Sequence, residues 1–290
     1  MGGSAIDCMG DTFRVATWNI LCQNVGRERR LRVITDRLTQ LTPDVVMFQE
    51  VWVGAADSIS TKLGMSVAVR STGVNGVDSN VAILSRWDVL EQESGRFPFE
   101  SSGLPLDQEQ SDSLTPGVGN VDNWAYALLQ SPCGRLVAVY TSHLAWGGLE
   151  EPVRLKQAVY LELLARGVAE RHPSAVHVLG GDLNATPESS TVRFMTGLQG
   201  SGDVGAFWVD AWAASGSGYG FTSDPSRLSY AVDTARSVGI HDVSQIPGRR
   251  IDFLMSRGWV YGRPGFPLQC EVFDGEGGSD HNGVFAEFAF

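Results

Sequence analysis

The sequence predicts a protein of the α/β class, in which short strands alternate with amphipathic helices. One indication is a strand, helix, strand order near the start, and a second is a pair of hairpin-like segments farther along. The third is the apolar run at 176–179, which leads through two glycines into a polar loop. Hydrophobic residues recur with a period of two in some segments and near 3.6 in others, so both element types are expected.

The first unit is the strand, helix, strand segment. Side chains alternate over residues 13–20, which predicts a strand that delivers Asn19 at its far end. Apolar residues follow at helical spacing over 28–41. A continuous apolar strand is then predicted over 44–48, and it ends in a polar pair that includes Glu50.

Two hairpins are predicted next, each with turn-forming residues between its strands. The paired segments are 65–70 with 80–84, and 123–130 with 135–142. Residues 87–93 are expected to extend the first hairpin, and the second hairpin ends at His143. The Pro-, Gly- and Ser-rich segment 95–118 is too long for an ordinary connection, so it is either disordered or part of a substrate rim. A helix is expected to open at Pro152.

The central polar loop carries Asp182 and Asn184, two residues apart. On an extended backbone, residues at this spacing point to the same side. One interpretation is a functional pair, and the other is an Asx turn, which is a common use of these residues at a strand end. A short helix is predicted over 189–196.

The C-terminal part begins with weak patterning over 200–250, which we expect to be mostly loop. Three further strands are predicted at 251–255, 268–273 and 283–290. The first of these contains Asp252, and Asp280 and His281 stand ahead of the last.

Composition favours one soluble domain over residues 1–290. The chain is 43% hydrophobic, which is enough for a full core, and no shift in composition divides it. The formal net charge of -11 disfavours non-specific binding to nucleic acid. Neither a signal-peptide core nor eighteen consecutive apolar residues occurs in the sequence. We therefore expect no transmembrane segment, a cytoplasmic location and a monomer.

The four cysteines are far apart and show no C-x-x-C spacing. They are Cys8, Cys22, Cys133 and Cys270. We expect unpaired thiols in a reducing compartment, in preference to a metal knuckle or a disulfide framework.

Eight polar side chains stand at the ends of predicted strands. A single histidine or aspartate in such a place is usually structural. Eight together indicate a ligand site, because sites in sheet proteins collect where strands pass into loops. The residues are Asn19, Glu50, His143, Asp182, Asn184, Asp252, Asp280 and His281.

Six short motifs contain these residues. They are Thr17-Trp18-Asn19, Phe48-Gln49-Glu50-Val51, His143-Leu144, Gly181-Asp182-Leu183-Asn184, Arg250-Ile251-Asp252 and Ser279-Asp280-His281. In type and order they resemble the endonuclease/exonuclease/phosphatase superfamily, which includes pancreatic deoxyribonuclease, exonuclease III, neutral sphingomyelinases and inositol polyphosphate 5-phosphatases. The resemblance implies a DNase-like, four-layer αββα sandwich of two packed mixed sheets. It also implies a divalent metal site at one edge.

The resemblance further implies a metal-dependent phosphoric ester hydrolase. Glu50, Asn19 and Asp280 would lie at the metal, and such oxygen donors suit Mg²⁺, with Mn²⁺ as the alternative cation. Neither a thiolate cluster nor a histidine cluster in the sequence suggests zinc.

The remaining site residues would act on the phosphoester and on water. By resemblance, Asp182 would orient or deprotonate the attacking water, and Asn184 would hold that water or a phosphate oxygen. His281, paired with Asp252, would contact the phosphoryl oxygens. His143 would bind the phosphate or assist the leaving group.

The metal site leaves the substrate open. The acidic surplus favours a small-molecule phosphoester, either a soluble organic phosphate or a lipid-like metabolite. A DNA or RNA nuclease is the alternative, followed by a recruited biosynthetic enzyme or an inactive binding module on the same fold. Arg29 and Arg30 are candidates to receive a second anionic group, although a charge run of this kind more often forms a solvated helix face. Trp146 is a candidate substrate contact, against the alternative of a packed tight turn.

Overall fold

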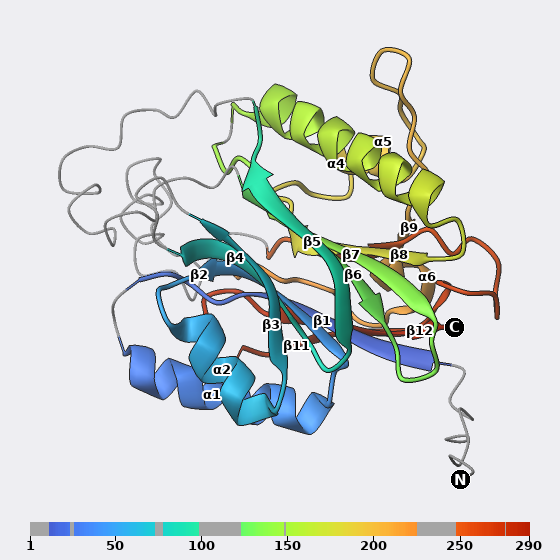
Figure 1. Cartoon of the computed structure of the whole chain (residues 1–290). Helices are drawn as coiled ribbons and strands as arrows, with labels where there is room; N and C mark the ends of the chain where they lie inside the picture. The colour runs from blue at the N-terminus through green and yellow to red at the C-terminus, as the bar shows by residue number, and fades with distance from the viewer. Residues whose placement is uncertain are drawn as a thin grey trace, which may run out of the picture.

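Two six-stranded sheets lie face to face between outer helices in this computed structural model, which describes residues 12–23, 26–72, 78–98, 123–147, 149–224, 248–275 and 277–290 (Figure 1). The first sheet has the order β11-β12-β1-β2-β4-β3. Its strands are β1 (Thr12–Asn19), β2 (Val45–Val51), β3 (Ser66–Thr72), β4 (Asp78–Ser85), β11 (Pro267–Phe273) and β12 (Gly283–Ala289).

The second sheet has the order β5-β6-β7-β8-β10-β9. Its strands are β5 (Asp88–Arg96), β6 (Asn123–Gln130), β7 (Leu136–His143), β8 (Val176–Asp182), β9 (Val209–Asp210) and β10 (Asp252–Ser256). The helices are α1 (Arg27–Leu41), α2 (Ala55–Leu63), α4 (Glu151–Arg171), α5 (Ser190–Met195) and α6 (Ala211–Ser215). The four-layer sandwich predicted from the family resemblance is confirmed.

Both sheets are mixed because each contains one parallel pair joined through a helix. Strand β1 runs parallel to β2 with α1 between them in the chain, and β7 runs parallel to β8 with α4 between them. Such crossovers bring the carboxyl ends of the two joined strands to the same edge of a sheet. The polar residues that follow these strands are therefore gathered at one edge.

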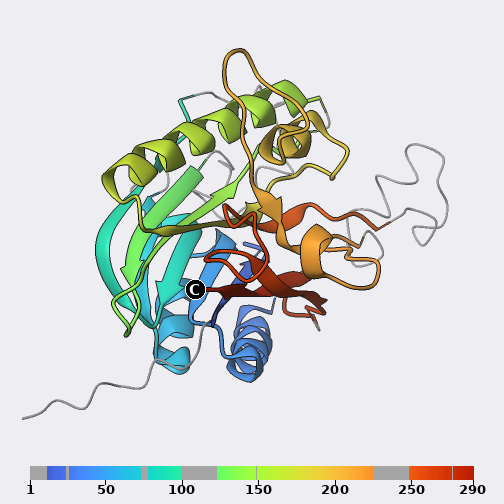
Figure 2. The same cartoon turned by 90° about the vertical axis from the view of Figure 1, so that its right-hand side faces the viewer.

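Three apolar layers hold the sandwich together. The inner layer lies between the sheets and includes Met47, Ile83 and Val139. A second layer packs α4 and α5 against the second sheet, and a third packs α1 and α2 against the first. Figure 2 shows this order from the side, with α4 above the sheets and α1 and α2 below them. Burial on both faces explains the continuous apolar runs Val45–Phe48 in β2 and Leu136–Tyr140 in β7.

The structure departs from the sequence-based expectations in three segments. Residues 87–93 do not extend the first hairpin, because β5 pairs with β6 in the other sheet. Helix α2 was not expected, since its nine residues carry only a short apolar stripe. The weakly patterned segment 200–250 contains β9 and α6, and its residues 225–247 lie outside the described part of the chain. Most of the predicted loop 95–118 also lies outside it.

The cysteines differ from expectation at one position. Cys22 and Cys270 are free and buried, whereas Cys133 is disulfide-bonded. The expectation that all four cysteines are unpaired is therefore wrong for Cys133. No helix within the described ranges is both long and apolar enough to cross a membrane.

Candidate active site

Three of the predicted site residues are neighbours on adjacent strands of the second sheet. The β7–β8 register pairs His143 with Asp182, and the β8–β10 register pairs Asp182 with Asp252. His143 and Asp182 end parallel strands, whereas Asp252 begins an antiparallel one, so all three reach the same edge. They are 3%, 1% and 0% exposed, which removes them from bulk water.

Asn19 joins this edge to the first sheet. Its Nδ2 donates to Glu50 Oε1 at 2.9 Å and to Asp182 Oδ2 at 3.0 Å, while its Oδ1 accepts from the backbone N–H of Leu21. One amide therefore separates two carboxylates that come from different sheets. The second Glu50 oxygen accepts from the backbone N–H of Cys22 at 3.0 Å.

The Glu50 carboxylate is held in its charged form. Burial raises its pKa, but His143 nearby and the hydrogen bonds from Asn19 and Cys22 lower it by more, so the net pKa lies below the ordinary value. A carboxylate of this kind stays ionised in a partly dry site and is available to a cation.

A β-bulge aims the Glu50 side chain. Gln49 pairs with Val81 and Val51 pairs with Asn80, which leaves Glu50 as the extra residue in β2. Glu50 has φ 52° and Asn80 has φ 87°, both in the region that non-glycine residues seldom adopt.

This part of the backbone is unusual. Within the described ranges five non-glycine residues have positive φ, and four of them, Leu21, Glu50, Asn80 and Asn184, lie at this edge of the sandwich. Each such conformation costs on the order of 1–3 kcal/mol. Strain that collects at one place indicates that the surrounding packing holds these side chains in set positions.

His281 and Asp252 form a buried pair. The Nδ1 atom of His281 lies 2.9 Å from Asp252 Oδ2, and its Nε2 lies 3.9 Å from Asp182 Oδ2. Burial lowers the pKa of His281, but the carboxylates of Asp252, Asp182 and Asp280 raise it well above the ordinary value. The imidazole is therefore held as a cation that can donate from Nε2.

The loop that carries His281 is fixed to β1. Ser279 Oγ donates to the Asn19 carbonyl at 2.6 Å, and Trp18 Nε1 donates to the His281 carbonyl at 3.0 Å. On the other side, Thr222 Oγ1 accepts from the backbone N–H of Asp252 at 3.0 Å. The His281–Asp252 pair is thus supported by contacts with β1 and with the loop that contains Thr222.

Asp182 forms the Asx turn and also faces the other polar residues of the site. Its Oδ1 accepts from the backbone N–H of Asn184 at 2.9 Å, which is an Asx turn. Its Oδ2 faces Asn19 and the two imidazoles of His143 and His281. The Asn184 side chain donates to the Leu144 carbonyl at 3.0 Å and so ties the loop after β8 to the loop after β7.

His143 has a partner that sequence reasoning missed. Its Nε2 lies 3.5 Å from Asp182 Oδ2, and its Nδ1 lies 3.3 Å from Oδ1 of Asn80. Asn80 lies near the beginning of β4, whereas most of the eight predicted site residues lie at or near the carboxyl ends of strands. Because β4 is antiparallel to β2, its beginning lies beside the end of β2. The sequence did contain a signal for this contact, because Asn80 is a polar residue at the start of a strand that was expected to be antiparallel.

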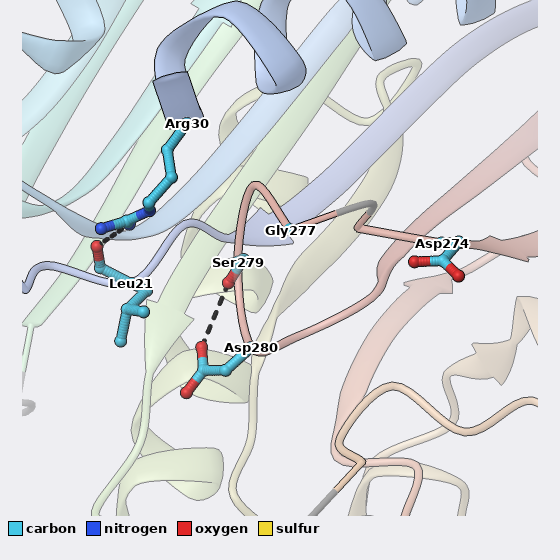
Figure 3. A pocket seen from close by; sticks show the side chains of 6 residues that line it. All are labelled: Leu21, Arg30, Asp274, Gly277, Ser279 and Asp280. Atoms are coloured by element: carbon cyan, nitrogen blue, oxygen red, sulfur yellow. Dashed lines mark hydrogen bonds between the residues drawn. The ribbon is translucent and has the colours of Figure 1, made fainter. Parts of the chain in front are cut away.

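Asp280 lies at the border of a cavity of about 480 Å³ (Figure 3). Its Oδ1 accepts from Ser279 Oγ at 3.2 Å, and burial raises its pKa. The other lining residues are Leu21, Arg30, Asp274, Gly277 and Ser279.

Arg30 and Arg29 have different surroundings although they are adjacent. The Arg30 guanidinium donates to the carbonyls of Ile20, Leu21, Gln23 and Gly278, and it stacks on Trp52 at 4.9 Å. Arg30 is therefore buried beneath the 20–23 segment. Arg29 is exposed.

Trp146 is 60% exposed on the loop after β7. In the part of the chain that the structure describes, no hydrogen bond or ion pair joins Trp146 or Arg29 to the buried carboxylates. The structure therefore brings together the eight strand-end residues and leaves these two side chains at the periphery.

The structure thus combines a four-layer sandwich with buried acids, amides and imidazoles at one edge. The chain belongs to the endonuclease/exonuclease/phosphatase family, whose family model matches residues 16–281. Members of this family are hydrolases that act on phosphoester bonds.

Two curated relatives are similar over parts of the chain. One is an inositol phosphosphingolipids phospholipase C of Schizosaccharomyces pombe, 25% identical over 206 residues, which is 67% of this chain and 45% of that protein. The other is a probable CCR4-Not complex 3'-5'-exoribonuclease subunit Ccr4 of Encephalitozoon cuniculi, 35% identical over 87 residues, or 30% of this chain and 18% of that protein. The chain thus spans less than half the length of either relative.

Among solved structures, truncated TDP2 of Caenorhabditis elegans superposes with a TM-score of 0.67 at 18% identity. The match covers 96% of this chain and 98% of that one. At this identity the likeness establishes the fold alone.

Proposed function

We propose that this chain is a divalent-cation-dependent phosphoesterase that hydrolyses a phosphomonoester or phosphodiester of a small organic or lipid-like metabolite. The observation that carries the proposal is the position of Asp182, whose Oδ2 is approached by Asn19 at 3.0 Å, His143 at 3.5 Å and His281 at 3.9 Å. A carboxylate among donors of this kind can orient water beside an anionic phosphoryl group.

The donor set fits a hard cation. Asp252 Oδ1 is buried without a hydrogen-bond partner in the described structure, and Asp182, Asp252 and His281 have possible ligand atoms within 4.8 Å of one another. The surrounding carboxylates hold His281 as an imidazolium, however, and its Nε2 then carries a proton and has no lone pair to offer a metal.

Glu50 and Asp280 are therefore the stronger candidates to hold Mg²⁺ or Mn²⁺, because hard cations prefer oxygen donors. Asn19 would join them through Oδ1, which now accepts from Leu21. When bound, the cation supplies positive charge to the phosphoryl oxygens.

The protein's own residues divide the remaining work. Asp182 orients the attacking water and accepts its proton, while Asn184 helps to hold the water or a phosphate oxygen. His281, kept cationic by Asp252, donates from Nε2 to a phosphoryl oxygen. His143 serves the leaving oxygen.

The substrate class is inferred from charge and from one relative. A net charge of -11 repels a polyanion at long range, which favours a small or lipid-like substrate. The Schizosaccharomyces pombe relative is named as a phospholipase C for inositol phosphosphingolipids, and it matches two thirds of this chain. We place exposed Arg29 and Trp146 at the substrate's non-reacting part.

A nuclease is the second candidate. The observation in its favour is the 35% identity to the exoribonuclease subunit, over 87 residues. A recruited biosynthetic enzyme or an inactive binding module is disfavoured, because the acids, amides and imidazoles that phosphoester hydrolysis requires are all present at one edge.

The test is a product-release screen with and without Mg²⁺ over nucleotides, sugar phosphates, inositol phosphates, phospholipids and plasmid DNA. Asp182→Ala should abolish release, and Asp203→Ala, which alters an exposed aspartate, is the matched control. Cleavage of DNA alone would reverse the substrate ranking. Release that survives Asp182→Ala would refute the proposed site.

A further inference from the structure

The two imidazoles of the site differ in the partner of their Nδ1 atoms. His281 has the carboxylate of Asp252 at 2.9 Å, and His143 has the amide oxygen of Asn80 at 3.3 Å. Both direct Nε2 toward the same Asp182 carboxylate. The Nδ1 atoms of the two histidines therefore face a charged acceptor in one case and a neutral acceptor in the other.

An amide oxygen accepts hydrogen bonds and cannot donate them. The contact with Asn80 therefore requires a proton on Nδ1 of His143. When His143 is neutral, its Nε2 must then carry a lone pair, which faces Asp182 Oδ2 at 3.5 Å. Two facing acceptors repel each other, so a proton-bearing group that approaches both from the side would be attracted to them.

Without Asn80 the opposite tautomer would be favoured. A neutral imidazole beside a carboxylate gains a hydrogen bond by placing its single proton on the nitrogen that faces it, here Nε2 toward Asp182. His143 in that state could not accept a proton at Nε2. Asn80 opposes this arrangement without adding a further negative charge to a site that already contains Glu50 and Asp182.

The backbone supports the assignment independently. Asn80 is 3% exposed and has φ 87°, opposite the bulge at Glu50. Asparagine is among the few residues that tolerate positive φ, and holding it there costs free energy. The side chain is thus delivered to His143 by a backbone conformation that local preference alone would not select.

We propose that Asn80 is a positioning residue that holds neutral His143 as the Nδ1–H tautomer, so that Nε2 is the nitrogen that exchanges a proton with the leaving group. This role in the reaction rests on the proposed function, whereas the tautomer does not.

The proposed step conserves protons and charge. Cationic His143 gives its Nε2 proton to the leaving oxygen as the bond from phosphorus to that oxygen breaks. The oxygen of the attacking water forms the new bond to phosphorus, and the water's proton passes to Asp182. His143 ends as the neutral Nδ1–H form, which Asn80 stabilises. The proton held by Asp182 then passes, directly or through solvent, to Nε2 of His143, which restores both residues for the next cycle.

The first test is spectroscopic and does not require activity. Nitrogen chemical shifts of ¹⁵N-histidine-labelled protein report which ring nitrogen carries the proton, and His143→Gln assigns the signal among the five histidines. At a pH where His143 is neutral, the wild type should show Nδ1–H. Asn80→Gly, which suits positive φ, should shift the population to Nε2–H, and Asn80→Asp should restore Nδ1–H.

Asn123→Ala is the matched control, because Asn123 is a buried amide paired with His143 across the β6–β7 ladder. It should leave the tautomer unchanged. An Nε2–H wild type, or an Asn80→Gly protein that keeps Nδ1–H, overturns the inference. If Asn80→Gly fails to fold, the wild-type and Asn80→Asp spectra still decide it.

The second test compares leaving groups. Asn80→Gly should slow hydrolysis of an alkyl phosphoester by roughly 10²-fold, the scale of general-acid catalysis. With a p-nitrophenyl ester, which needs little protonation, the rate should change only a few-fold. Equal losses on both esters would refute the role. A wild type inactive on every phosphoester would refute the proposed function and leave the tautomer test standing.

Discussion

Nδ1 of His281 lies 2.9 Å from Oδ2 of Asp252, and the two side chains are 10% and 0% exposed. The two residues are 29 positions apart and come from a loop and from β10. Because the pair is dry and also faces Asp182, it keeps the imidazole cationic where an isolated histidine would lose its proton.

Replacing Asp252 by asparagine should show whether its carboxylate keeps His281 cationic. Because the carboxylates hold the pKa of His281 above its ordinary value, the cation persists until pH rises through that raised pKa. Asp252→Asn should therefore move the alkaline limit of phosphoester hydrolysis to lower pH and reduce the rate at neutral pH by roughly 10²-fold. The measurement is the hydrolysis rate of the wild type and of the variant as a function of pH. Asp57→Asn, which alters an exposed ion pair, is the control. An unchanged alkaline limit contradicts the assignment.

Substitution of Arg30 should affect stability, whereas substitution of Arg29 should affect substrate binding. Arg30→Met leaves four carbonyls of buried or partly buried backbone without their donor, so we expect a loss of about 3 kcal/mol or more in unfolding free energy. Arg29→Met, at an exposed position, should leave stability unchanged and raise KM for an anionic substrate. Urea unfolding and initial rates measure both. Equal destabilisation by the two variants would mean that the loss of stability comes from any change at the start of α1, and not from removal of the buried guanidinium.

Gln49 connects the two sheets behind the site. Its Nε2 donates to Thr141 Oγ1 at 2.9 Å and to Thr17 Oγ1 at 3.1 Å, all in a region with no exposure. Gln49→Leu should cost about 2 kcal/mol of unfolding free energy, because two buried hydroxyls lose a partner. The triple variant with Thr17→Val and Thr141→Val should recover much of that loss. If the triple variant is less stable than Gln49→Leu, the polar bridge is not the cause.

His177 lies away from the candidate active site, and it should make the unfolding free energy depend on pH. Burial, with smaller effects of Arg257 and His172, lowers its pKa to about 4. As pH falls from about 6.5 toward 4, the unfolded chain binds a proton that the native protein refuses, so unfolding free energy falls, by roughly 3 kcal/mol in total.

The comparison with His177→Gln isolates this effect. In that variant the unfolded chain should bind one proton fewer in excess of the native protein. The unfolding free energy measured in urea should therefore depend less steeply on pH over the same interval. If the wild type and the variant show the same slope of unfolding free energy against pH, His177 has the same pKa in the native and the unfolded state, and the prediction is wrong.

Periodicity was informative where an element's character is local. The alternation in β1, the helical spacing of α1 and the apolar run of β8 reflect which faces of a single element meet the core, and all three were found near their predicted bounds. Helix α2 was missed because nine residues hold too few turns to show a period. Residues 87–93 were recognised as a strand but assigned to the wrong hairpin, since pairing depends on a partner some thirty-five residues away.

Residue type and short-range order were sufficient to predict the fold class, the family resemblance and the eight polar residues at strand ends. Packing between distant elements was needed to show that Arg30 lies under the 20–23 segment while Arg29 faces solvent, and that Asn80 contacts His143. Both outcomes depend on which element packs across from which. That choice is made by the burial of whole sheets and helices, and no window of neighbouring residues contains it.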